Sequence, residues 1–359
     1  MLSALDPGAL RLVGPRLELQ LLGLAVVAVV ATAVLWRRGR RHRRLAAGVS
    51  AILVIAFLAS IANTTLQAYP TMADVLGRPR YPSPSEAGTA EAQQNGAVAS
   101  IRVPDTASHF GSFTAQVWLP PQYFTEPTRR FPVAILTHGN PGRSTDWLDS
   151  GSAAATGQEV ARSGHPVILV MPTVLRKPTG DSLCVDSSTQ GHAETYVVDD
   201  VVAAVDHQLR TMPDAAHRTL GGFSMGGFCA LNLGLLHPDV FSVALAFSAL
   251  TVCEPDAIAG GNEALFDTPD WQTQVDENSP ATYAEHLDSA KGPALWLDAG
   301  DDETELLDPL KELGSTLSHR GFTVESHVRA GGHDFGVWAA ALHDALPWAA
   351  ERMTSPPAA

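Results

Sequence analysis

The sequence predicts an α/β domain, built on a mostly parallel sheet with helices on both faces, preceded by two transmembrane helices. Along residues 101–351, short apolar runs alternate with helix-like stretches, a pattern typical of parallel strands joined by crossover helices. Near the amino terminus the apolar runs are longer and uncharged. The 359 residues are 45% hydrophobic and 17% charged, which excludes wholesale disorder.

The membrane anchor is predicted to occupy residues 1–65. Residues 20–36 and 45–65 are almost wholly apolar, and each approaches the roughly 20 residues that a helix needs to cross a bilayer. The segment between them, residues 37–44, carries six arginines, and short arginine-rich loops stay on the cytoplasmic side. We therefore expect a helical hairpin in the cell membrane that leaves residues 66–359 outside the cytoplasm.

Two other interpretations of this region are weaker. A cleaved signal peptide would need a basic amino terminus beside a short apolar run and an A-x-A site, and the sequence shows neither. A nucleic-acid patch at the arginines is disfavoured by the two flanking apolar runs. Eight arginines and two acids give residues 1–64 a net charge of +6. Because the whole chain has a net charge of −14, the remaining residues carry −20. Such an acidic body excludes a general nucleic-acid binder, because phosphate contacts need clustered Lys and Arg.

A linker and one large domain are expected next. Residues 66–100 are rich in Pro, Gly, Ser, Ala and Gln, which is typical of a flexible linker, and residues 352–359 form a short tail. Within residues 101–351, several runs are apolar throughout and suit strands buried on both faces. The expected strands are 113–119, 133–137, 167–171, 219–223, 243–247, 294–298 and 323–329, and the expected helices lie near 155–163, 194–211, 226–236, 304–320 and 336–350.

The most informative motif is Gly-Phe-Ser-Met-Gly at residues 222–226. It follows an expected strand and opens an expected helix, as the tight turn that presents the nucleophilic serine of α/β-hydrolases does. We therefore predict that Ser224 is a nucleophile and that the amide of Met225 faces the developing oxyanion. A chance match is the alternative, and the strand–turn–helix context disfavours it.

A second loop, His-Gly-Asn-Pro-Gly at residues 138–142, follows the strand 133–137. In α/β-hydrolases the loop at this place supplies the second oxyanion-hole amide. Asn140 is the expected donor, with Gly139 as the alternative, and His138 is expected to be structural rather than a base. A plain Gly/Pro turn is the competing interpretation.

The third motif is Gly-Gly-His at residues 331–333, between the last expected strand and the last expected helix. A histidine must accept the serine proton and return it to the leaving group. Among the 13 histidines, His333 has the right place, a glycine-flanked loop at the carboxyl edge of the sheet. We predict that it is the general base.

The triad acid should lie between the serine and the histidine in the chain. The strand 294–298 leads into a run of acids, and Glu303 stands three positions after Gly300, the usual spacing. Glu303 is the expected acid, and Asp302 is the main alternative. Asp301 and Asp298 are further candidates. The carboxylates of this run that are not the triad acid are expected to be solvated loop residues.

With these motifs, residues from about 110 to 351 resemble the esterase D / antigen 85 group of α/β-hydrolases. The resemblance rests on HGNPG, AETYVVDDVVAAVDHQL, GGFSMGGFCALNLGLLHPDVF, LWLDAGDDETEL and GGHDFGVWAAALHDALPWAA. It implies an α/β-hydrolase fold that cleaves carboxylic esters or thioesters or, as in the mycolyltransferases, moves acyl chains onto sugars. Carried over residue by residue, the triad falls on Ser224, Glu303 and His333, and the oxyanion hole on Asn140 and Met225.

The three cysteines lead to one structural prediction. Cys184 and Cys253 both lie in loops expected at the active-site edge, and thiols outside the cytoplasm are usually oxidised. We therefore expect a Cys184–Cys253 disulfide that pins the insertion 253–292 to the loop before the elbow. Cys229, on the helix after the elbow, is expected to be a free core residue.

The acidic insertion 253–292 is a candidate lid, because insertions at this edge often cover the substrate. Phe266 and Trp271 are candidates for lining an acyl pocket, and ordinary packing explains them equally well. The sequence has no glycine-rich phosphate loop and no metal-ligand spacing, so we expect no cofactor and no metal.

These observations together predict a membrane-anchored, extracytoplasmic serine esterase that acts on carboxylic or acyl-lipid esters through an acyl-enzyme. An acyltransferase acting on cell-envelope glycans or lipids is the alternative within enzymes. A peptidase would use the same triad, and an inactive hydrolase fold serving as a membrane-bound binding module is the alternative outside enzymes. The acyl chain, the acceptor and the oligomeric state do not follow from the sequence.

Overall fold

The computed structural model describes residue 12 and residues 15–38, 43–66, 80–176, 180–254, 265–266 and 268–354. The chain divides into two compact units, Met1–Arg80 and Tyr81–Ala359. Each unit is described by itself.

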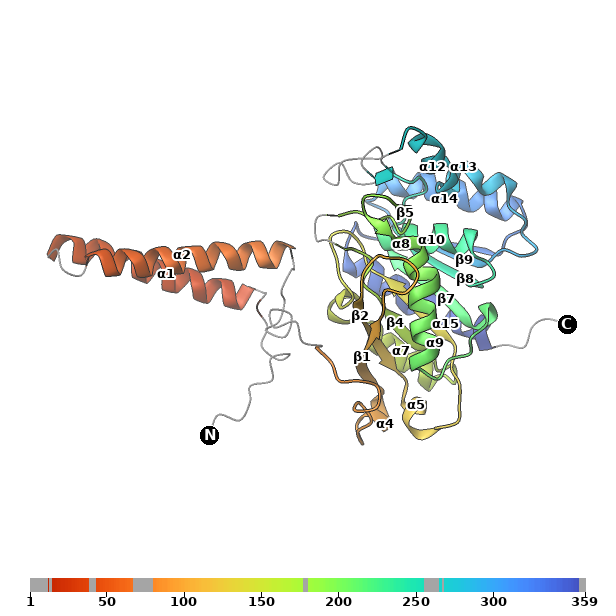
Figure 1. The fold of residues 1–359 in the computed structure, drawn as a ribbon, viewed down its shortest axis with the longest axis horizontal. Helices are drawn as coiled ribbons and strands as arrows, with labels where there is room; N and C mark the ends of the chain where they lie inside the picture. Colours follow the sequence, from red (N-terminus) through yellow and green to blue (C-terminus); the bar gives the residue numbers. More distant parts are fainter. Residues whose placement is uncertain are drawn as a thin grey trace. The chain divides into compact units, whose positions relative to one another are not determined.

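The first unit contains two packed helices, α1 (Pro15–Arg38) and α2 (Arg43–Leu66) (Figure 1). The hydroxyls of Thr32 and Ser50 form a hydrogen bond of 2.8 Å between them, whereas most of the large apolar side chains that the structure describes on these helices are exposed. Leu17–Val34 is long and apolar enough to cross a membrane, whereas the apolar part of α2, Ala46–Ile61, is shorter. The helical pair is therefore observed, and its crossing of a membrane stays a prediction.

The second unit is built on an eight-stranded, mostly parallel sheet with the order β1-β2-β4-β3-β7-β8-β9-β10 (Figure 1). From β4 to β10 the neighbouring strands pair in parallel, and β2 pairs antiparallel with both β1 and β4. The strands are β1 (Ala97–Val103), β2 (Phe113–Leu119), β3 (Val133–Thr137), β4 (Ile168–Met171), β7 (Arg218–Phe223), β8 (Val243–Phe247), β9 (Ala294–Gly300) and β10 (Val324–Arg329). The sheet begins earlier than the sequence suggested, because the first four residues of β1, 97–100, were assigned to the linker.

Helices cover both faces of the sheet because the inner strands are buried on both sides. One face carries π-helix η1 (Tyr196–Val201), α9 (Val202–Gln208), α10 (Met225–Leu236) and α14 (Thr304–His319), and the other carries α7 (Ala153–Arg162) and α15 (Phe335–Thr354). In β3, for example, Ile135 packs into the core on the first face and Leu136 into the core on the second. This alternation places strand ends rather than strand faces at the solvent.

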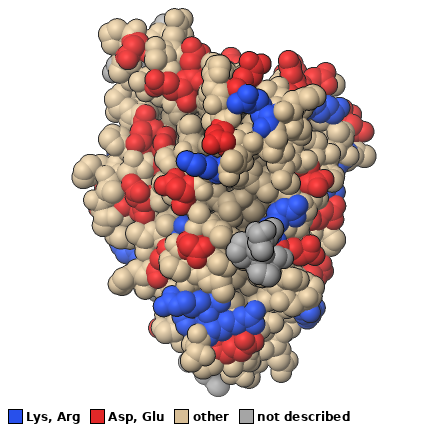
Figure 2. Space-filling model, turned by 90° about the vertical axis from the view of Figure 1, so that its right-hand side faces the viewer, with Lys and Arg blue, Asp and Glu red and all other residues tan. Residues whose placement is uncertain are grey.

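Short elements complete the connections. These are α4 (Ala92–Asn95), α5 (Pro121–Thr125), α6 (Asp146–Asp149), the hairpin β5 (Asp186–Ser187) and β6 (Gly191–His192), α8 (Ala193–Thr195), η2 (Ala215–His217), α12 (Trp271–Glu277), α13 (Pro280–Tyr283) and η4 (Ala284–His286). The last three belong to the insertion between β8 and β9. Acidic side chains are spread over the face of the molecule seen in Figure 2, with fewer basic groups between them, as the acidic composition requires.

Candidate active site

Ser224 lies on a tight turn between β7 and α10, with φ 56° and ψ −124°. The two motif glycines permit this turn. A Cβ on Gly222 would lie 2.1 Å from the carbonyl oxygen of Gly226, and a Cβ on Gly226 would lie 2.5 Å from the carbonyl oxygen of Thr137. Both distances are far inside van der Waals contact, so the backbone can bend this sharply only with glycine at both positions. The serine is thereby held at the carboxyl edge of the sheet.

His333 is the residue that contacts this serine. Its Nε2 lies 2.8 Å from Ser224 Oγ, and its Nδ1 lies 2.5 Å from Oε1 of Glu303. The histidine loop is positioned by Asp301, whose Oδ1 accepts the amide of Gly331 at 2.9 Å. Gly331 has φ +132°, a conformation that favours glycine. The structure thus brings together the serine, histidine and glutamate that the sequence selected.

Glu303 is buried and its carboxylate is held at both oxygens. While Oε1 faces the histidine, Oε2 accepts hydrogen bonds from the hydroxyl of Ser248 and from the amide of Gly300, each at 2.7 Å. A carboxylate with donors on both oxygens remains fixed in orientation. This arrangement suits an acid that must hold an imidazole in one tautomer, with Nδ1 protonated and Nε2 free to accept a proton.

The other acids of this segment do not contact His333 through their side chains in the described structure. Asp298 is buried, and its two carboxylate oxygens share the single Nε–H of Arg329, at 2.8 and 3.0 Å. Burial raises the pKa of Asp298 in spite of that charge. Asp301 binds the histidine loop through a backbone amide. Asp302 is exposed and lines a surface hollow. The contacts therefore favour Glu303 as the acid over the main alternative, Asp302.

Ser248 and Trp338 extend this network, and the sequence alone did not reveal them. The indole Nε1 of Trp338 donates to Ser248 Oγ at 2.9 Å, and Ser248 in turn donates to Glu303. The Trp338 ring stacks on Phe223 with centroids 4.3 Å apart and meets the His333 ring edge-on at 4.9 Å. The signal available for Trp338 was its place five positions after His333 in the motif GGHDFGVWAAALHDALPWAA. Ser248 had none, because its contact with Glu303 spans 55 positions.

The predicted oxyanion loop lies directly over the nucleophile. A Cβ on Gly139 would approach the Cβ of Ser224 to 3.2 Å, so the loop and the elbow are close neighbours. Met225 is the first residue of α10, and the amide of a first helical residue has no acceptor within its helix. Asn140 lies next in the same loop and is partly exposed. Both predicted amides are therefore adjacent to the serine, and their catalytic use stays a prediction.

His138 has a structural place below this loop. Its Nδ1 contacts the carbonyl oxygen of Gly139 at 2.8 Å, and its Nε2 accepts the amide of Val174 at 3.1 Å. Because a backbone amide donates to Nε2, the proton is on Nδ1. Burial lowers the pKa of His138, which favours this neutral form. Both ring nitrogens are thus engaged with backbone groups.

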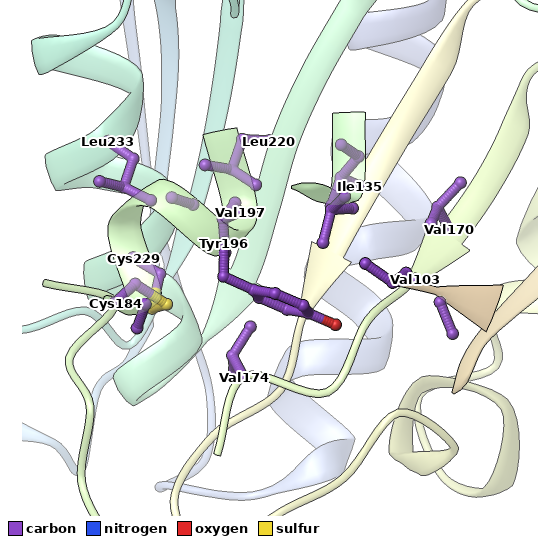
Figure 3. Close-up of a cluster of buried hydrophobic side chains, with 14 of the residues drawn as sticks. Val103, Ile135, Val170, Val174, Cys184, Tyr196, Val197, Leu220, Cys229 and Leu233 are labelled. Carbon is purple, nitrogen blue, oxygen red and sulfur yellow. A yellow bond between two sulfur atoms is a disulfide. The ribbon is translucent and has the colours of Figure 1, made fainter. Parts of the chain in front are cut away.

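The disulfide prediction was wrong. Cys184 is bonded to Cys229, with their Cα atoms 5.3 Å apart, and Cys253 is a buried free thiol (Figure 3). Cys229 lies on the face of α10 that packs into the same core as Cys184, so a residue taken for ordinary packing is the actual partner. Burial raises the pKa of the Cys253 thiol to about 12. The bond ties the loop before η1 to the helix that carries the nucleophile.

The insertion is held to the same region by hydrogen bonds instead. The hydroxyl of Ser188 donates to the carbonyl of Phe266 at 2.8 Å, and that of Ser187 donates to the carbonyl of Leu265. Phe266 is buried, and Trp271 packs partly buried against the same core. These two aromatic side chains therefore serve packing in the described structure. Residues 255–264 of the predicted lid lie outside the described residues.

A hollow of about 540 Å³ opens beside the triad, lined by residues 302–306 and His333. His333 is exposed and forms part of its lining. Within the described ranges, no group of three His, Cys, Asp or Glu side chains is arranged to hold a metal ion.

The site has the arrangement of the serine hydrolase class. A serine on a strained strand-to-helix turn is hydrogen-bonded to a histidine, and the histidine is hydrogen-bonded to a buried carboxylate. Comparison with known proteins agrees with this class. Residues 108–349, more than half of the chain, match the Esterase family, described as "Putative esterase". The chain belongs to this family and is a hydrolase.

Relatives and solved structures place the chain further. It is 28% identical over 356 residues to an uncharacterized protein from Corynebacterium glutamicum, covering 92% of this chain and 80% of that protein. It is 27% identical over 244 residues to an esterase from Mycobacterium tuberculosis, covering 61% of this chain and 52% of the relative. A solved ferulic acid esterase has a TM-score of 0.60 at 24% identity, covering 72% of this chain and 99% of its own. The last likeness shows the α/β-hydrolase fold.

Proposed function

We propose that this protein is a serine esterase that cleaves carboxylic esters through an acyl-enzyme on Ser224. The observation that carries the proposal is the continuous contact from Ser224 Oγ through His333 to Glu303, with distances of 2.8 and 2.5 Å. A serine hydroxyl is a weak nucleophile until a base removes its proton. His333 provides that base at hydrogen-bond distance from the serine, and Glu303 fixes the orientation of the imidazole through Nδ1.

The reaction proceeds in two halves. His333 takes the proton from Ser224 Oγ as the oxygen attacks the ester carbonyl, and the amides of Met225 and Asn140 stabilise the oxyanion. In comparable sites the loss of one such donor costs about 3–4 kcal/mol of transition-state stabilisation. The ester C–O bond then breaks, and the alkoxide receives the proton held by His333. Water attacks the acyl-enzyme by the same route in reverse, which releases the carboxylic acid.

We further propose that the enzyme is anchored in the cell membrane with its catalytic unit outside the cytoplasm. The apolar stretch Leu17–Val34 and the six arginines within residues 37–44 support this orientation. Topology reporters fused after Arg44 and at the carboxyl terminus test it. The first fusion should report the cytoplasm and the second the outside, and a cytoplasmic carboxyl terminus would overturn the localisation.

The apolar helices also favour a second candidate, acyl transfer to envelope lipids or glycans. Anchoring would confine the acyl-enzyme close to lipid acceptors, and an acceptor hydroxyl can resolve the acyl-enzyme as water does. Incubation of the full chain with an envelope lipid extract distinguishes the two functions. An esterase releases free acid, whereas a transferase leaves the acyl group on an extract component, and the mass of the adduct on Ser224 identifies the acyl chain.

The central test is covalent labelling by a fluorophosphonate probe. The wild-type chain should be labelled on Ser224, and Ser224→Ala should lose both labelling and hydrolysis of p-nitrophenyl butyrate. Ser289→Ala is the matched control, because Ser289 precedes β9 at the opposite edge of the sheet. If the Ser224→Ala chain retained near-native esterase activity, the proposed function would be rejected.

A further inference from the structure

The hollow beside His333 has a defined place in the reaction. It lies where β9 ends and α14 begins, and its lining includes His333, Glu303, Asp302 and Glu305. In the proposed function, the alkoxide of the departing alcohol takes the proton from His333 Nε2. The alcohol half of the ester must therefore lie within hydrogen-bond distance of this histidine. The described lining contains the histidine but neither Ser224 nor residues 138–142 of the oxyanion loop, which favours the alcohol half of the ester over the acyl chain as its occupant.

The wall of this hollow is negatively charged. Asp302 and Glu305 are both exposed, and neither forms a salt bridge in the described part of the chain. No Lys or Arg belongs to its lining. The third carboxylate, Glu303, faces the imidazole and is engaged in hydrogen bonds. A departing alcohol thus meets two carboxylates whose charge is not neutralised by the protein.

Two positive contributions oppose these carboxylates. His333 becomes positively charged while it holds the proton, and the adjacent carboxylate of Glu303 offsets that charge. The amino end of α14 points toward the hollow, and a helix amino terminus carries the equivalent of about half a positive charge. Two full negative charges outweigh this contribution. For unit charges about 6 Å apart in water, each carboxylate changes the binding of a charged group about three-fold, so two change it about ten-fold.

We propose that this hollow is the alcohol subsite and that Asp302 and Glu305 select the alcohol by its charge. Esters of cationic alcohols are preferred over esters of uncharged alcohols of the same shape, and esters of anionic alcohols are disfavoured. This inference rests on the proposed function, because it assigns the substrate class of the same site. The acyl chain does not enter it.

Three butyrate esters test the proposal with one acyl group. They are the esters of choline, of its uncharged carbon analogue 3,3-dimethylbutanol, and of 2-hydroxyethanesulfonate. The full chain is assayed in non-ionic detergent at low ionic strength, and kcat/KM is measured for each ester. For each variant, the kcat/KM of the choline ester is divided by that of the dimethylbutyl ester. This ratio is then compared with the wild-type ratio, so that the intrinsic reactivities of the esters cancel.

The expected results are specific. Asp302→Asn and Glu305→Gln should each lower the choline-to-dimethylbutyl ratio about three-fold, and the double variant about ten-fold, while the relative rate with the sulfonate ester rises by similar factors. Salt should reduce the wild-type preference, since exposed charges are screened. Glu312→Gln is the matched control. It removes the same charge from the same helix about 10 Å farther along and should leave the ratios unchanged.

The outcomes separate this inference from the proposed function. If all three esters are hydrolysed in a Ser224-dependent way and the ratios are the same in wild type and the double variant, the charge selection is overturned and the esterase function stands. If Glu312→Gln changes the ratios as much as the hollow variants do, the effect belongs to the general field of the protein, and the subsite is overturned. If no ester acylates Ser224, both the function and the inference are rejected.

Discussion

Replacing Ser248 by alanine tests whether the second layer of the site controls catalysis. Glu303 Oε2 has two donors, the Ser248 hydroxyl and the Gly300 amide, each at 2.7 Å. The substitution removes one of them. A hydrogen bond to a charged group contributes about 1.5–3 kcal/mol, so a carboxylate freed to turn away from His333 should lower kcat/KM about 10- to 150-fold. Ser248 has φ 47°, which costs the same for serine and alanine because both carry a Cβ.

The same substitution also affects stability, for a separate reason. It leaves the buried indole N–H of Trp338 without its acceptor, which should cost about 1–3 kcal/mol of unfolding free energy. Trp338→Phe removes that N–H and can keep an aromatic ring stacked on Phe223. The double variant Ser248→Ala with Trp338→Phe should therefore recover much of the unfolding free energy that the serine variant loses, without recovering the rate.

The assay combines p-nitrophenyl butyrate hydrolysis with urea unfolding for the two single variants and the double variant. Trp338→Phe alone should cost only a few-fold in kcat/KM, because the Ser248 hydroxyl still donates to Glu303. If rate and stability fell together and recovered together across the set, Ser248 would act on the fold alone and the positioning role would be refuted. An unchanged rate in Ser248→Ala would refute it as well.

Three further predictions concern the acid, the disulfide and pH. Glu303→Gln should lower kcat by about 10⁴, as in a related triad, whereas Asp302→Asn should cost less than ten-fold with an uncharged ester. If hydrolysis of p-nitrophenyl butyrate fell more in Asp302→Asn than in Glu303→Gln, Asp302 would be assigned as the acid instead. Cys229→Ala should lower the unfolding free energy by about 4 kcal/mol in urea titrations, because the bond closes a loop with a sequence separation of 45, and an unchanged midpoint would contradict this. The hydrogen bond to Glu194 raises the pKa of His237 above its usual 6.5. The interaction of the protonated His237 with Glu194 therefore contributes fully to the unfolding free energy below pH 6.5, and this contribution is lost as pH rises through the raised pKa. Unfolding measured from pH 5.5 to 8.5 should show this decline in wild type and a weaker one in His237→Gln.

The parts of the fold and site that the sequence could predict follow from local chemistry. The glycines at 222 and 226 mark a turn that tolerates no side chain, and the position of His333 follows from a glycine-flanked loop after a strand. Glu303 follows from chain order and its spacing after Gly300. The predicted strands correspond to β2, β3, β4 and β7–β10. Buried parallel strands such as β3, β4 and β8 are apolar nearly throughout, whereas β10 is partly exposed and largely polar. Each of these signals is contained within a few neighbouring residues.

The missed parts depend on distances between segments far apart in the chain. Three cysteines allow three pairings, and only the packing of α10 against the loop before η1 selects Cys184 with Cys229. Strand β1 was not predicted, and its first four residues, 97–100, were assigned to the linker. Ser100 and Arg102 interrupt its apolar residues, and an edge strand need not be apolar throughout. Ser248 reaches Glu303 through the adjacency of β8 and β9, and sequence spacing does not reveal which strands are neighbours.

The strand order has a mechanical consequence if the enzyme is anchored as proposed. Strands β7, β8, β9 and β10 support the serine, the network and the histidine, and they form one half of the sheet. The chain enters this unit at the other end, through the edge strand β1, which pairs antiparallel with β2. In the sheet, β2, β4 and β3 lie between β1 and the catalytic strands, so a pull transmitted along the chain from residue 80 acts on the edge strand before it acts on them. We therefore expect such a pull to strain the pairing of β1 with β2 before it disturbs the alignment of the reacting groups.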